Sequence, residues 1–555
     1  RRGWQDSAPP AGGIAPIRAR ITFMTQSFLG RRGIAVAPHN LASESALRVL
    51  REGGNALEAM IAAAASIAVV YPHMNSIGGD GFWVVGGASG PLAGIDASGA
   101  SAAAASLESY AQRGVRGSIP FRGGIAALTV AGTVSGWGAA HALAREWGGR
   151  LPLARLLEDA IWYARQGIPV THSQRAATAA KREELQGIAG FAETFLVDGQ
   201  APAAFSRFRQ PRLAATLAHI AEHGCDDFYR GALAKQLAAE LAAVGSPLTL
   251  ADLAAHQAKR VDPLTLAIPG ATLANMTPPS QGVVSLMILG IMQRLQGWDA
   301  DPLGAAFVHA QVEATKQAFK LRDQHVTDPA FMRIAPAELL RAEVLDELAA
   351  KIDARRAAPW GRRTDPGDTV WMGVIDGEGR AVSFIQSIYH EFGAGVVLAG
   401  SGINWQNRGC SFSLDAAHIN ALAPRKRPFH TLNPALARLA DGRLMVYGTM
   451  GGDGQPQTQA TVFNRIQRFG LEPQPAIELP RWLLGRTWGS ASDSLKLEAR
   501  FPSSTVEALR AMGHDVELLT DWDESVGHAG ALIREADGLL MGGFDPRSNG
   551  AVAAF

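Results

Sequence analysis

The sequence changes character abruptly at residues 351–369, KIDARRAAPWGRRTDPGDT. Before this stretch, amphipathic runs such as RLAATLAHIAEHG and AAFVHAQVEATKQAFKLRD predict mainly helices. After it, TVWMGVI and RAVSFIQSIY flank a DGEG turn, and a second hairpin is predicted around Asp441-Gly442. The arginines, prolines and glycines between the two parts predict an exposed linker. A chain divided in this way is expected to form a layered α/β fold.

The N-terminal part contains two helices in tandem with clear boundaries. Ser43 is expected to cap a helix that ends near Glu52, and Asn55 is expected to cap the next helix, which runs through Val70. The apolar run AMIAAAASIAVVY within the second helix has only 13 residues. Because a bilayer-spanning helix needs about 20 residues, this run predicts a buried core helix.

Composition excludes several classes of protein. The 52 basic and 51 acidic side chains nearly cancel, so no global field would gather nucleic acid or an anionic membrane. Two cysteines, Cys225 and Cys410, cannot form a disulfide framework or a four-thiolate metal site. The sequence has no phosphate-binding G-x-x-x-x-G-K-[ST] loop, H-E-x-x-H helix or G-x-S-x-G elbow. We expect no metal and no organic cofactor.

Residues 1–32 are expected to form a flexible leader. They contain six arginines and one acid but no apolar run of signal-peptide length. A cytoplasmic enzyme that binds neither nucleic acid nor membrane is therefore expected.

Thr369 is the candidate nucleophile. A threonine hydroxyl is weakly nucleophilic, but when threonine is the first residue of a chain its own α-amine can act as the base. Thr369 opens a predicted strand directly after the exposed linker, where a cut between Asp368 and Thr369 is sterically possible. The alternative is a structural threonine at the start of a strand, and spacing alone does not separate the two.

A family resemblance supports the catalytic interpretation. The segments ASESALRVLREGGNALEAMIAAAASIAVVYPHMNSIGGDGF, MTPPSQGVV, DTVWMGVIDGEGRAVSFIQSI, SGINWQNRG, RPFHTLNPAL, GTMGGDGQPQTQ and DPRSNGAVAAF occur in this order. Read together, they resemble the γ-glutamyltransferase family of N-terminal-nucleophile hydrolases over nearly all of residues 33–555.

The resemblance implies a precursor that cuts itself between Asp368 and Thr369. A helix-rich large subunit, 33–368, and a β-rich small subunit, 369–555, would together form a four-layer αββα sandwich. Thr369 would serve as nucleophile and α-amine base, and Ser387 would orient it. Gly451 and Gly452 would supply the backbone N–H groups of the oxyanion hole. The earlier GGDG, residues 78–81, is interpreted as a structural turn.

Three departures from the family pattern concern the substrate. An arginine expected in a D-F-R-E-like stretch is absent from residues 96–99, DASG. Ser411 stands where an acid is expected, and His430-Thr431 replaces a pair of serines. The two missing charges would have gripped a zwitterionic glutamyl group, so glutathione is not expected to be the main substrate.

The stretches WQNRGCSFSLD and RPFHTLNPAL resemble most the branch with oxamate amidohydrolases of purine-nitrogen breakdown and cephalosporin acylases. A small amide that bears a carboxylate, such as oxamate, is expected to need a small pocket with one cationic or multi-donor anchor. Arg408 is the candidate, with a structural ion pair as the alternative. The other expected lining residues are Tyr389, Asn407, His430 and Thr431.

Two alternative functions stay open. The first is a cephalosporin or glutaryl acylase with weak γ-glutamyl transfer or glutathione hydrolysis. The second is an unprocessed, non-catalytic scaffold. Expected partners are the small amide substrate and the two subunits of one precursor, which could pair further into a dimer of heterodimers.

Overall fold

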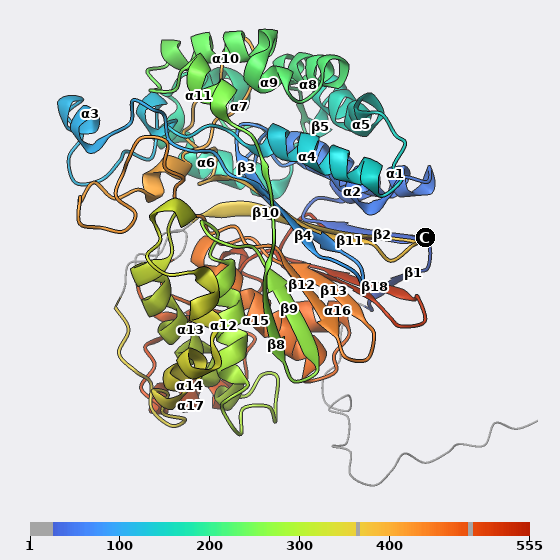
Figure 1. Cartoon of the computed structure of the whole chain (residues 1–555), viewed down its shortest axis with the longest axis vertical. Helices are drawn as coiled ribbons and strands as arrows, with labels where there is room; N and C mark the ends of the chain where they lie inside the picture. Colours follow the sequence, from blue (N-terminus) through green and yellow to red (C-terminus); the bar gives the residue numbers. More distant parts are fainter. Residues whose placement is uncertain (1–25, 362–366, 487–491) are drawn as a thin grey trace, which may run out of the picture.

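A computed structural model describes residues 26–361, 367–486 and 492–555 of the chain. Two large β-sheets lie face to face, and helices cover the outer face of each sheet (Figure 1). This is the predicted four-layer αββα sandwich. Both sheets combine strands from the two sides of the linker, so neither part of the chain forms a sandwich without the other.

The first sheet carries the predicted nucleophile. Its central hairpin is the one predicted around DGEG, and its remaining pairs are also antiparallel. In spatial order the strands are β19 (Ala551–Ala554), β2 (Gly33–Ala37), β10 (Asp368–Asp376), β11 (Ala381–Tyr389), β3 (Asp80–Gly86), β4 (Ala93–Ala97) and β7 (Lys259–Val261).

The second sheet contains the hairpin predicted around Asp441-Gly442. Its strands, in spatial order, are β1 (Phe28–Gly30), β18 (Leu540–Phe544), β17 (Gly530–Arg534), β13 (Leu444–Gly448), β12 (Ala435–Leu439), β9 (Ala271–Asn275) and β8 (Leu264–Ile268). Two smaller sheets are peripheral: β14 (Trp482–Leu484), β15 (Leu495–Glu498) and β16 (Val516–Leu519) form one, and β5 (Ile168–Pro169) and β6 (Arg207–Phe208) form the other.

The helical layer on the first sheet is built around α2 (Ala56–Val70), all of whose residues are buried. Asn55 and Glu58 form a reciprocal capping box that fixes its start, as the sequence predicts for Asn55. The layer continues with α1 (Asn40–Arg51), α3 (Leu107–Gln112), α4 (Thr133–Glu146), α5 (Leu153–Gln166), α6 (His172–Leu185), α7 (Phe191–Phe195), α8 (Pro211–His223), α9 (Asp227–Arg230), α10 (Ala232–Ala243) and α11 (Leu250–Ala255).

The layer on the second sheet contains fewer helices. The apolar helix α12 (Gly282–Met292) is entirely buried against the sheet and its neighbouring helices. Around it lie α13 (Ala305–His325), α14 (Ala342–Ala350), α15 (Gln455–Gln467) and α16 (Pro473–Glu478), and α17 (Ser503–Ala511) packs with the three-stranded sheet.

Trp371 joins the two sheets. It belongs to β10, two residues after Thr369, and its indole lies in the apolar layer between the sheets. The ring rests on Gly448 and Gly530, which face each other in β13 and β17. A Cβ at either glycine would overlap the indole, so part of the glycine content of this chain makes room for one tryptophan.

Two sequence predictions differ from the structure at their boundaries. The first helix begins at Asn40 rather than after Ser43, because the side chain of His39 caps it. Ser43 instead donates from Oγ to the carbonyl of Ala551, 2.7 Å away. Residues 1–25 of the expected leader lie outside the described residues, but Phe28–Gly30 forms an ordered edge strand, so the fold begins before Gly33.

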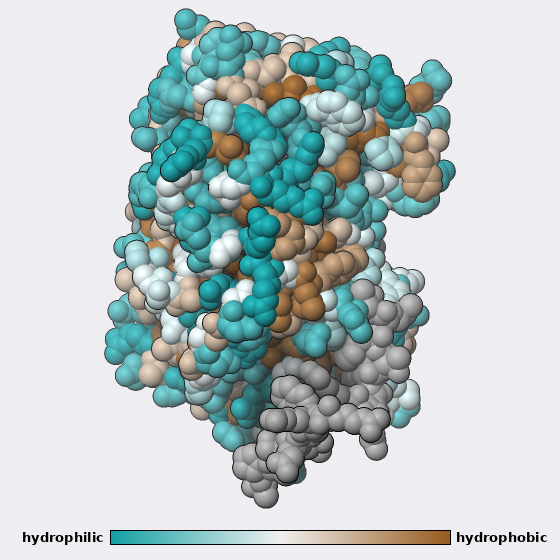
Figure 2. Space-filling model, turned by 90° about the vertical axis from the view of Figure 1, so that its right-hand side faces the viewer, coloured by the Kyte–Doolittle hydropathy of each residue, from teal (hydrophilic) through white to brown (hydrophobic). Residues whose placement is uncertain are grey.

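The face shown in Figure 2 is mainly polar above and below, and its apolar residues gather near mid-height. No helix among the described residues is both long enough and apolar enough to cross a membrane.

The contact between Trp371 and Gly448 can be tested directly. Gly448→Ala would push a methyl group into the indole, and such overpacking typically costs about 1–3 kcal/mol. We expect a melting temperature several degrees below that of the wild type. Gly187→Ala is the control, because its Cβ would meet no atom within 4 Å. Equal melting temperatures for the two variants would contradict the role given to this contact.

Candidate active site

Thr369 lies at the start of β10, opposite an irregularity in β11. Asp368 pairs with Tyr389 and Val370 with Gln386, so β11 contains one extra residue in this interval. Such a bulge redirects the side chains beside it. Thr369 is 1% exposed and is the second residue of β10, directly after Asp368.

Two side chains contact the Thr369 hydroxyl. Its Oγ1 donates to Ser387 Oγ at 3.3 Å, and the same Ser387 oxygen accepts from the backbone N–H of Tyr389 at 2.8 Å. Gln455 Nε2 lies 3.5 Å from Thr369 Oγ1. The contact of Ser387 matches the sequence-based expectation, whereas Gln455 was not predicted, although it belongs to the GGDGQPQTQ segment.

The turn that carries Gly451 and Gly452 follows β13 and leads into α15. Both glycines have positive φ, 114° and 52°, a region that side chains with a Cβ rarely adopt. The carbonyl of Met450 accepts from Thr449 Oγ1 at 2.9 Å, and that of Gly451 accepts from the Gly454 N–H at 2.8 Å. These bonds fix the peptide planes whose N–H groups belong to Gly451 and Gly452.

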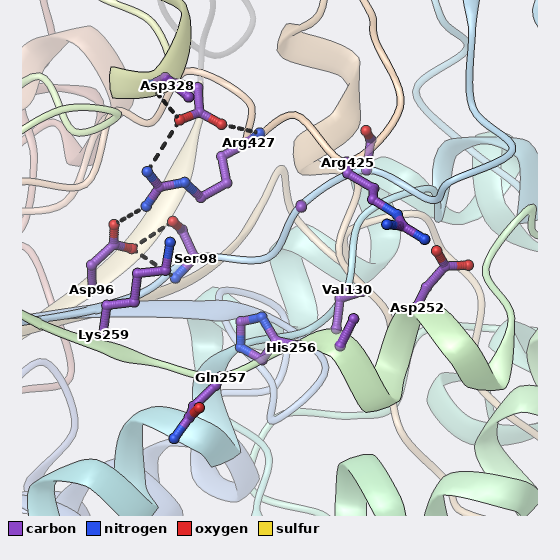
Figure 3. A pocket seen from close by; sticks show the side chains of 14 residues that line it. Asp96, Ser98, Val130, Asp252, His256, Gln257, Lys259, Asp328, Arg425 and Arg427 are labelled. Carbon is purple, nitrogen blue, oxygen red and sulfur yellow. Dashed lines mark hydrogen bonds and ion pairs between the residues drawn. The ribbon is translucent and has the colours of Figure 1, made fainter.

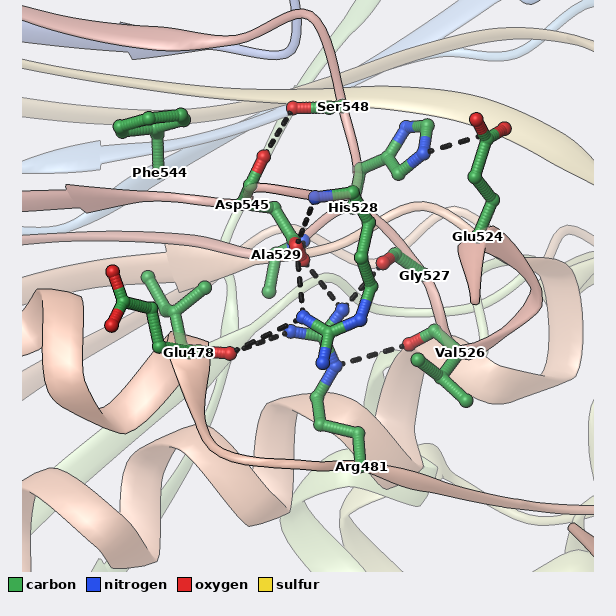
Figure 4. A network of polar contacts seen from close by, with 12 residues as sticks. Glu478, Arg481, Glu524, Val526, Gly527, His528, Ala529, Phe544, Asp545 and Ser548 are labelled. Atoms are coloured by element: carbon green, nitrogen blue, oxygen red, sulfur yellow. Dashed lines mark hydrogen bonds and ion pairs between the residues drawn. The ribbon is translucent and has the colours of Figure 1, made fainter. Parts of the chain in front are cut away.

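A buried ionic network, shown in Figure 4, holds Gly527, which packs against the residues just before the turn. Arg481 donates to the carbonyls of Val526 and Gly527 and to Asp545, at 3.2, 2.5 and 2.5 Å. Burial alone would raise the pKa of Asp545, but Arg481 and Arg547 hold it below its usual range. Gly527 packs closely on the turn, since a Cβ there would collide with Thr449 Oγ1.

Arg408 lies in a buried cluster with two other predicted lining residues. Its guanidinium carbon is 3.7 Å from the centre of the Tyr389 ring, and its NH2 donates to Thr431 Oγ1 at 3.3 Å. Arg408 is only 1% exposed. Tyr389 has a φ of 82°, which marks a strained backbone position at the end of β11. The structure therefore brings Arg408 and Thr431, from two separate loops, against Tyr389 at the end of β11, the strand that holds Ser387.

His430 faces a buried carboxyl group that sequence analysis treated as part of a structural turn. Its Nε2 lies 3.2 Å from Asp80 Oδ2, and Asp80 Oδ1 accepts from the N–H groups of Gly99 and Gly132, each at 3.0 Å. Burial raises the pKa of Asp80 to about 7. Burial and the nearby Arg408 and Arg427 hold the pKa of His430 well below its usual range, so His430 is neutral at pH 7.

Asn407 and Ser411 are bonded to the backbone. Asn407 Nδ2 donates to the carbonyl of Phe121 at 2.9 Å, and its Oδ1 accepts from the N–H of His390 at 3.2 Å. Ser411 Oγ donates to the carbonyls of Arg408 and Phe429, at 3.0 and 3.1 Å. Both side chains thus brace the loop around Arg408.

The stretch that lacks the expected arginine borders a cavity of about 320 Å³ (Figure 3). Asp96 forms an ion pair with Arg427 and accepts from Ser98 Oγ at 2.5 Å. Arg427 also contacts Asp328, at 3.1 Å. Arg427 is therefore neutralised by two carboxylates, whereas Arg408 lies in the separate cluster with Tyr389 and Thr431.

A second cavity, of about 470 Å³, borders the strand just before the nucleophile. Gly367 contributes to its wall, together with His73, His390 and Glu524. One side is formed by small residues of α6 and by Lys181. Burial, together with Asp523 and Asp545, raises the pKa of Glu524 to about 7. Glu391 of the same wall lies 3.8 Å from Lys181 Nζ.

Among the described residues, His309, Glu313 and His514 could hold a metal ion, because their ligand atoms lie within 4.8 Å of one another. Their present contacts are different. His309 Nδ1 and His514 Nε2 lie 2.8 Å apart, which is a hydrogen-bond distance, and Glu313 Oε1 accepts from Lys316 Nζ at 2.7 Å. The Lys316 ammonium supplies the positive charge beside Glu313, so these residues are better suited to structural bonding than to a cation.

The fold and the site together define a class of protein. A threonine at the head of a central strand of an αββα sandwich, with a backbone turn beside it, is the arrangement of an N-terminal-nucleophile hydrolase. The Gamma-glutamyltranspeptidase family model matches residues 42–555, and the chain belongs to this family. It is an amidohydrolase of that class.

Relatives of known name cover the whole fold. The chain is 60% identical to the oxamate amidohydrolase proenzyme of Klebsiella pneumoniae, across 96% of this chain and 100% of the relative. It is 40% identical to the glutathione hydrolase-like YwrD proenzyme of Bacillus subtilis, across 95% and 99%. The crystal structure of cephalosporin acylase from Bacillus halodurans superposes with a TM-score of 0.88 at 33% identity, covering 98% and 99%.

Because the pKa of Asp80 is raised, we expect the substitution Asp80→Asn to increase the stability of the folded state by an amount that depends on pH. In wild type the folded state holds its proton up to about pH 7, whereas the unfolded chain releases it near pH 4, so stability falls as pH rises through this window. A three-unit shift corresponds to at most about 4 kcal/mol. The melting temperature of the variant relative to wild type should therefore be higher at pH 8 than at pH 5. A difference that is constant with pH would show that Asp80 is ionised throughout.

Proposed function

We propose that this protein cuts itself between Asp368 and Thr369 and then hydrolyses oxamate to oxalate and ammonia. The observation that carries the proposal is the buried Arg408, bonded to Thr431 and stacked on Tyr389. Tyr389 ends the strand whose Ser387 contacts the nucleophile. It is supported by 60% identity to a relative named oxamate amidohydrolase proenzyme.

Self-cleavage would create the catalytic base. In the uncleaved chain the nitrogen of Thr369 is part of a peptide bond and cannot accept a proton. Once the bond to Asp368 is broken, the large subunit ends at Asp368 and the small subunit begins with a free amine on Thr369. That amine lies on the same residue as Oγ1, so it can take the hydroxyl proton during attack.

Turnover would then proceed through an acyl-enzyme. Thr369 Oγ1 attacks the amide carbonyl, and the oxygen that becomes negative is stabilised by the N–H groups of Gly451 and Gly452. The α-amine passes its proton to the departing ammonia, and water releases the acyl group. Ser387 orients the hydroxyl of Thr369, and Gln455 is a further contact that we assign to the nucleophile.

The carboxylate of oxamate would be held by Arg408. A guanidinium offers parallel N–H donors that match the two oxygens of a carboxylate, and burial strengthens this contact. Thr431 and the neutral His430 would complete the wall of the carboxylate-binding pocket. Asn407 would support this wall through its hydrogen bonds to the backbone of Phe121 and His390. A glutamyl substrate would need two adjacent charged side chains of opposite sign, one for its α-carboxylate and one for its α-amino group. The proposed oxamate site uses only the positive one, Arg408.

One observation favours a second candidate, an acylase acting on larger amides. The cavity of about 470 Å³ beside Gly367 is several times larger than oxamate requires. The similarity to cephalosporin acylase points in the same direction.

For the oxamate-hydrolysing enzyme we further propose a role in purine-nitrogen breakdown, a cytoplasmic location and the pairing of processed heterodimers.

The nucleophile is tested with Thr369→Ala. Wild type should give two bands on a denaturing gel and release ammonia and oxalate from oxamate, because the hydroxyl is needed for both reactions. The variant should give one band near 58.6 kDa and no ammonia above background. N-terminal sequencing of the small fragment must begin with Thr-Val-Trp. Processing without oxamate hydrolysis would leave the cleavage assignment standing and reject oxamate.

The anchor is tested with Arg408→Met, using oxamate and its uncharged analogue oxamide. A charge-assisted hydrogen bond contributes about 1.5–3 kcal/mol, so kcat/KM for oxamate should fall by about 10- to 150-fold. The value for oxamide, which has no carboxylate, should change little. Arg425→Met is the control, because Arg425 is exposed and lines the cavity of about 320 Å³ beside Asp96. Equal losses for the two substrates would make Arg408 a structural residue.

A further inference from the structure

Gln281 connects two parts of the site that are far apart in the sequence. It belongs to the MTPPSQG segment and lies immediately before α12. Its side chain is fully buried, and Nε2 donates to the carbonyl of Thr431 at 2.9 Å and to the carbonyl of Gly452 at 3.0 Å. One amide group therefore ties the loop of Thr431 to the glycine turn.

Arg322 fixes which way this amide points. Its NH1 donates to Gln281 Oε1 at 3.0 Å and to Asp453 Oδ1 at 2.7 Å. With a cationic donor on one side and two carbonyls on the other, only one orientation of the carboxamide satisfies every group. Arg322 also bonds to Asp453, the residue directly after Gly452. Gln281 and Arg322, which we call the clamp, therefore contact the turn at two adjacent residues.

The clamp matters because the turn contains successive glycines. Glycine has more conformational freedom than any other residue, so the directions of its N–H groups must be fixed by bonds from outside. The Gly454 N–H holds the carbonyl of Gly451, and Gln281 holds the carbonyl of Gly452. Together these bonds fix the peptide planes on both sides of Gly452.

The Thr431 end of the clamp leads back to the nucleophile. The Thr431 carbonyl accepts a second bond from Asn433 Nδ2 at 2.8 Å, and Asn433 Nδ2 also donates to Gln455 Oε1 at 3.0 Å. Gln455 in turn contacts Thr369 Oγ1. The buried amides of Gln281, Asn433 and Gln455 thus form one network around the site.

We propose that Gln281 is a positioning residue that sets the oxyanion turn in register with the carboxylate-binding loop. The inference rests on the roles proposed above for Gly451, Gly452 and Thr431. Gln281 acts on the reaction only through their backbone, without touching the substrate. A shift of about 1 Å in such groups can cost on the order of 10²-fold in rate.

Gln281→Met tests the proposal, because methionine is similar in size but donates no hydrogen bond. The matched control is Gln311→Met, which removes another fully buried amide that bonds to Thr461 and does not contact the turn. We expect kcat of processed Gln281→Met to fall by about 30- to 100-fold with a smaller change in KM, because donor alignment matters most in the transition state. Gln311→Met should stay within threefold of wild type.

Melting temperatures separate positioning from stability. Gln281→Met should lose more stability than Gln311→Met, because it removes three side-chain hydrogen bonds rather than one. At a temperature where both variants remain folded, only Gln281→Met should lose kcat. A kcat for Gln281→Met within threefold of wild type, or an equal loss in Gln311→Met, would overturn the proposal. If wild type releases no ammonia from oxamate, the proposed substrate fails, and the same kcat comparison is made with a glutaryl amide, which tests Gln281 independently.

Discussion

The packing of the Trp371 indole between the two sheets determines the geometry on which the site depends. The indole lies on Gly448 and Gly530 of the opposite sheet, where no other residue type leaves room for it. Thr369 precedes this tryptophan by two residues, and Gly451 follows Gly448 by three. One close contact therefore sets the distance between the nucleophile on one sheet and the glycine turn on the other. Sheet packing, usually a matter of stability, here determines the alignment of reacting groups.

Around this contact, the site is stabilised mainly by neutral hydrogen bonds. Carboxamides and hydroxyls hold the nucleophile and the carbonyls of the turn, while burial disfavours charge on Asp80 and on His430. Arg427, Arg481 and Arg322 each have a carboxylate partner. Because little water reaches a buried site, the attraction between a guanidinium and an entering carboxylate is only weakly screened there.

The sequence was sufficient for features that depend on local pattern. The hairpins around DGEG and Asp441-Gly442, the cap at Asn55 and the buried helix after it all have short-range causes, and the structure confirms them. The class of fold followed from the order of long motifs. The cap at Ser43 was wrong because His39 competes for the same helix start, and the hydroxyl of Ser43 serves a distant strand.

The remaining residues of the site could not be predicted from local pattern. Gln281 and Gly452 are 171 positions apart, and only the packing of α12 against α15 and the sheet brings them together. Asp80 belongs to a glycine-rich segment whose pattern is typical of a turn. Its partner His430 lies in the loop that leads into β12 of the second sheet. For such residues the only sequence signal is a polar side chain inside an otherwise small or apolar motif.

The proposed cleavage after Asp368 would have two physical consequences that belong together. Before the cut, Gly367 lies so close to the Tyr389 ring that its Cβ would be 3.0 Å from a ring carbon, and Gly367 also walls the larger cavity. The ring that supports Arg408 is thus covered by the chain that leads to the scissile bond. Breaking that bond would free the α-amine that the reaction needs and would also allow this chain to move off the ring. A single covalent event would therefore both generate the base and open the binding site.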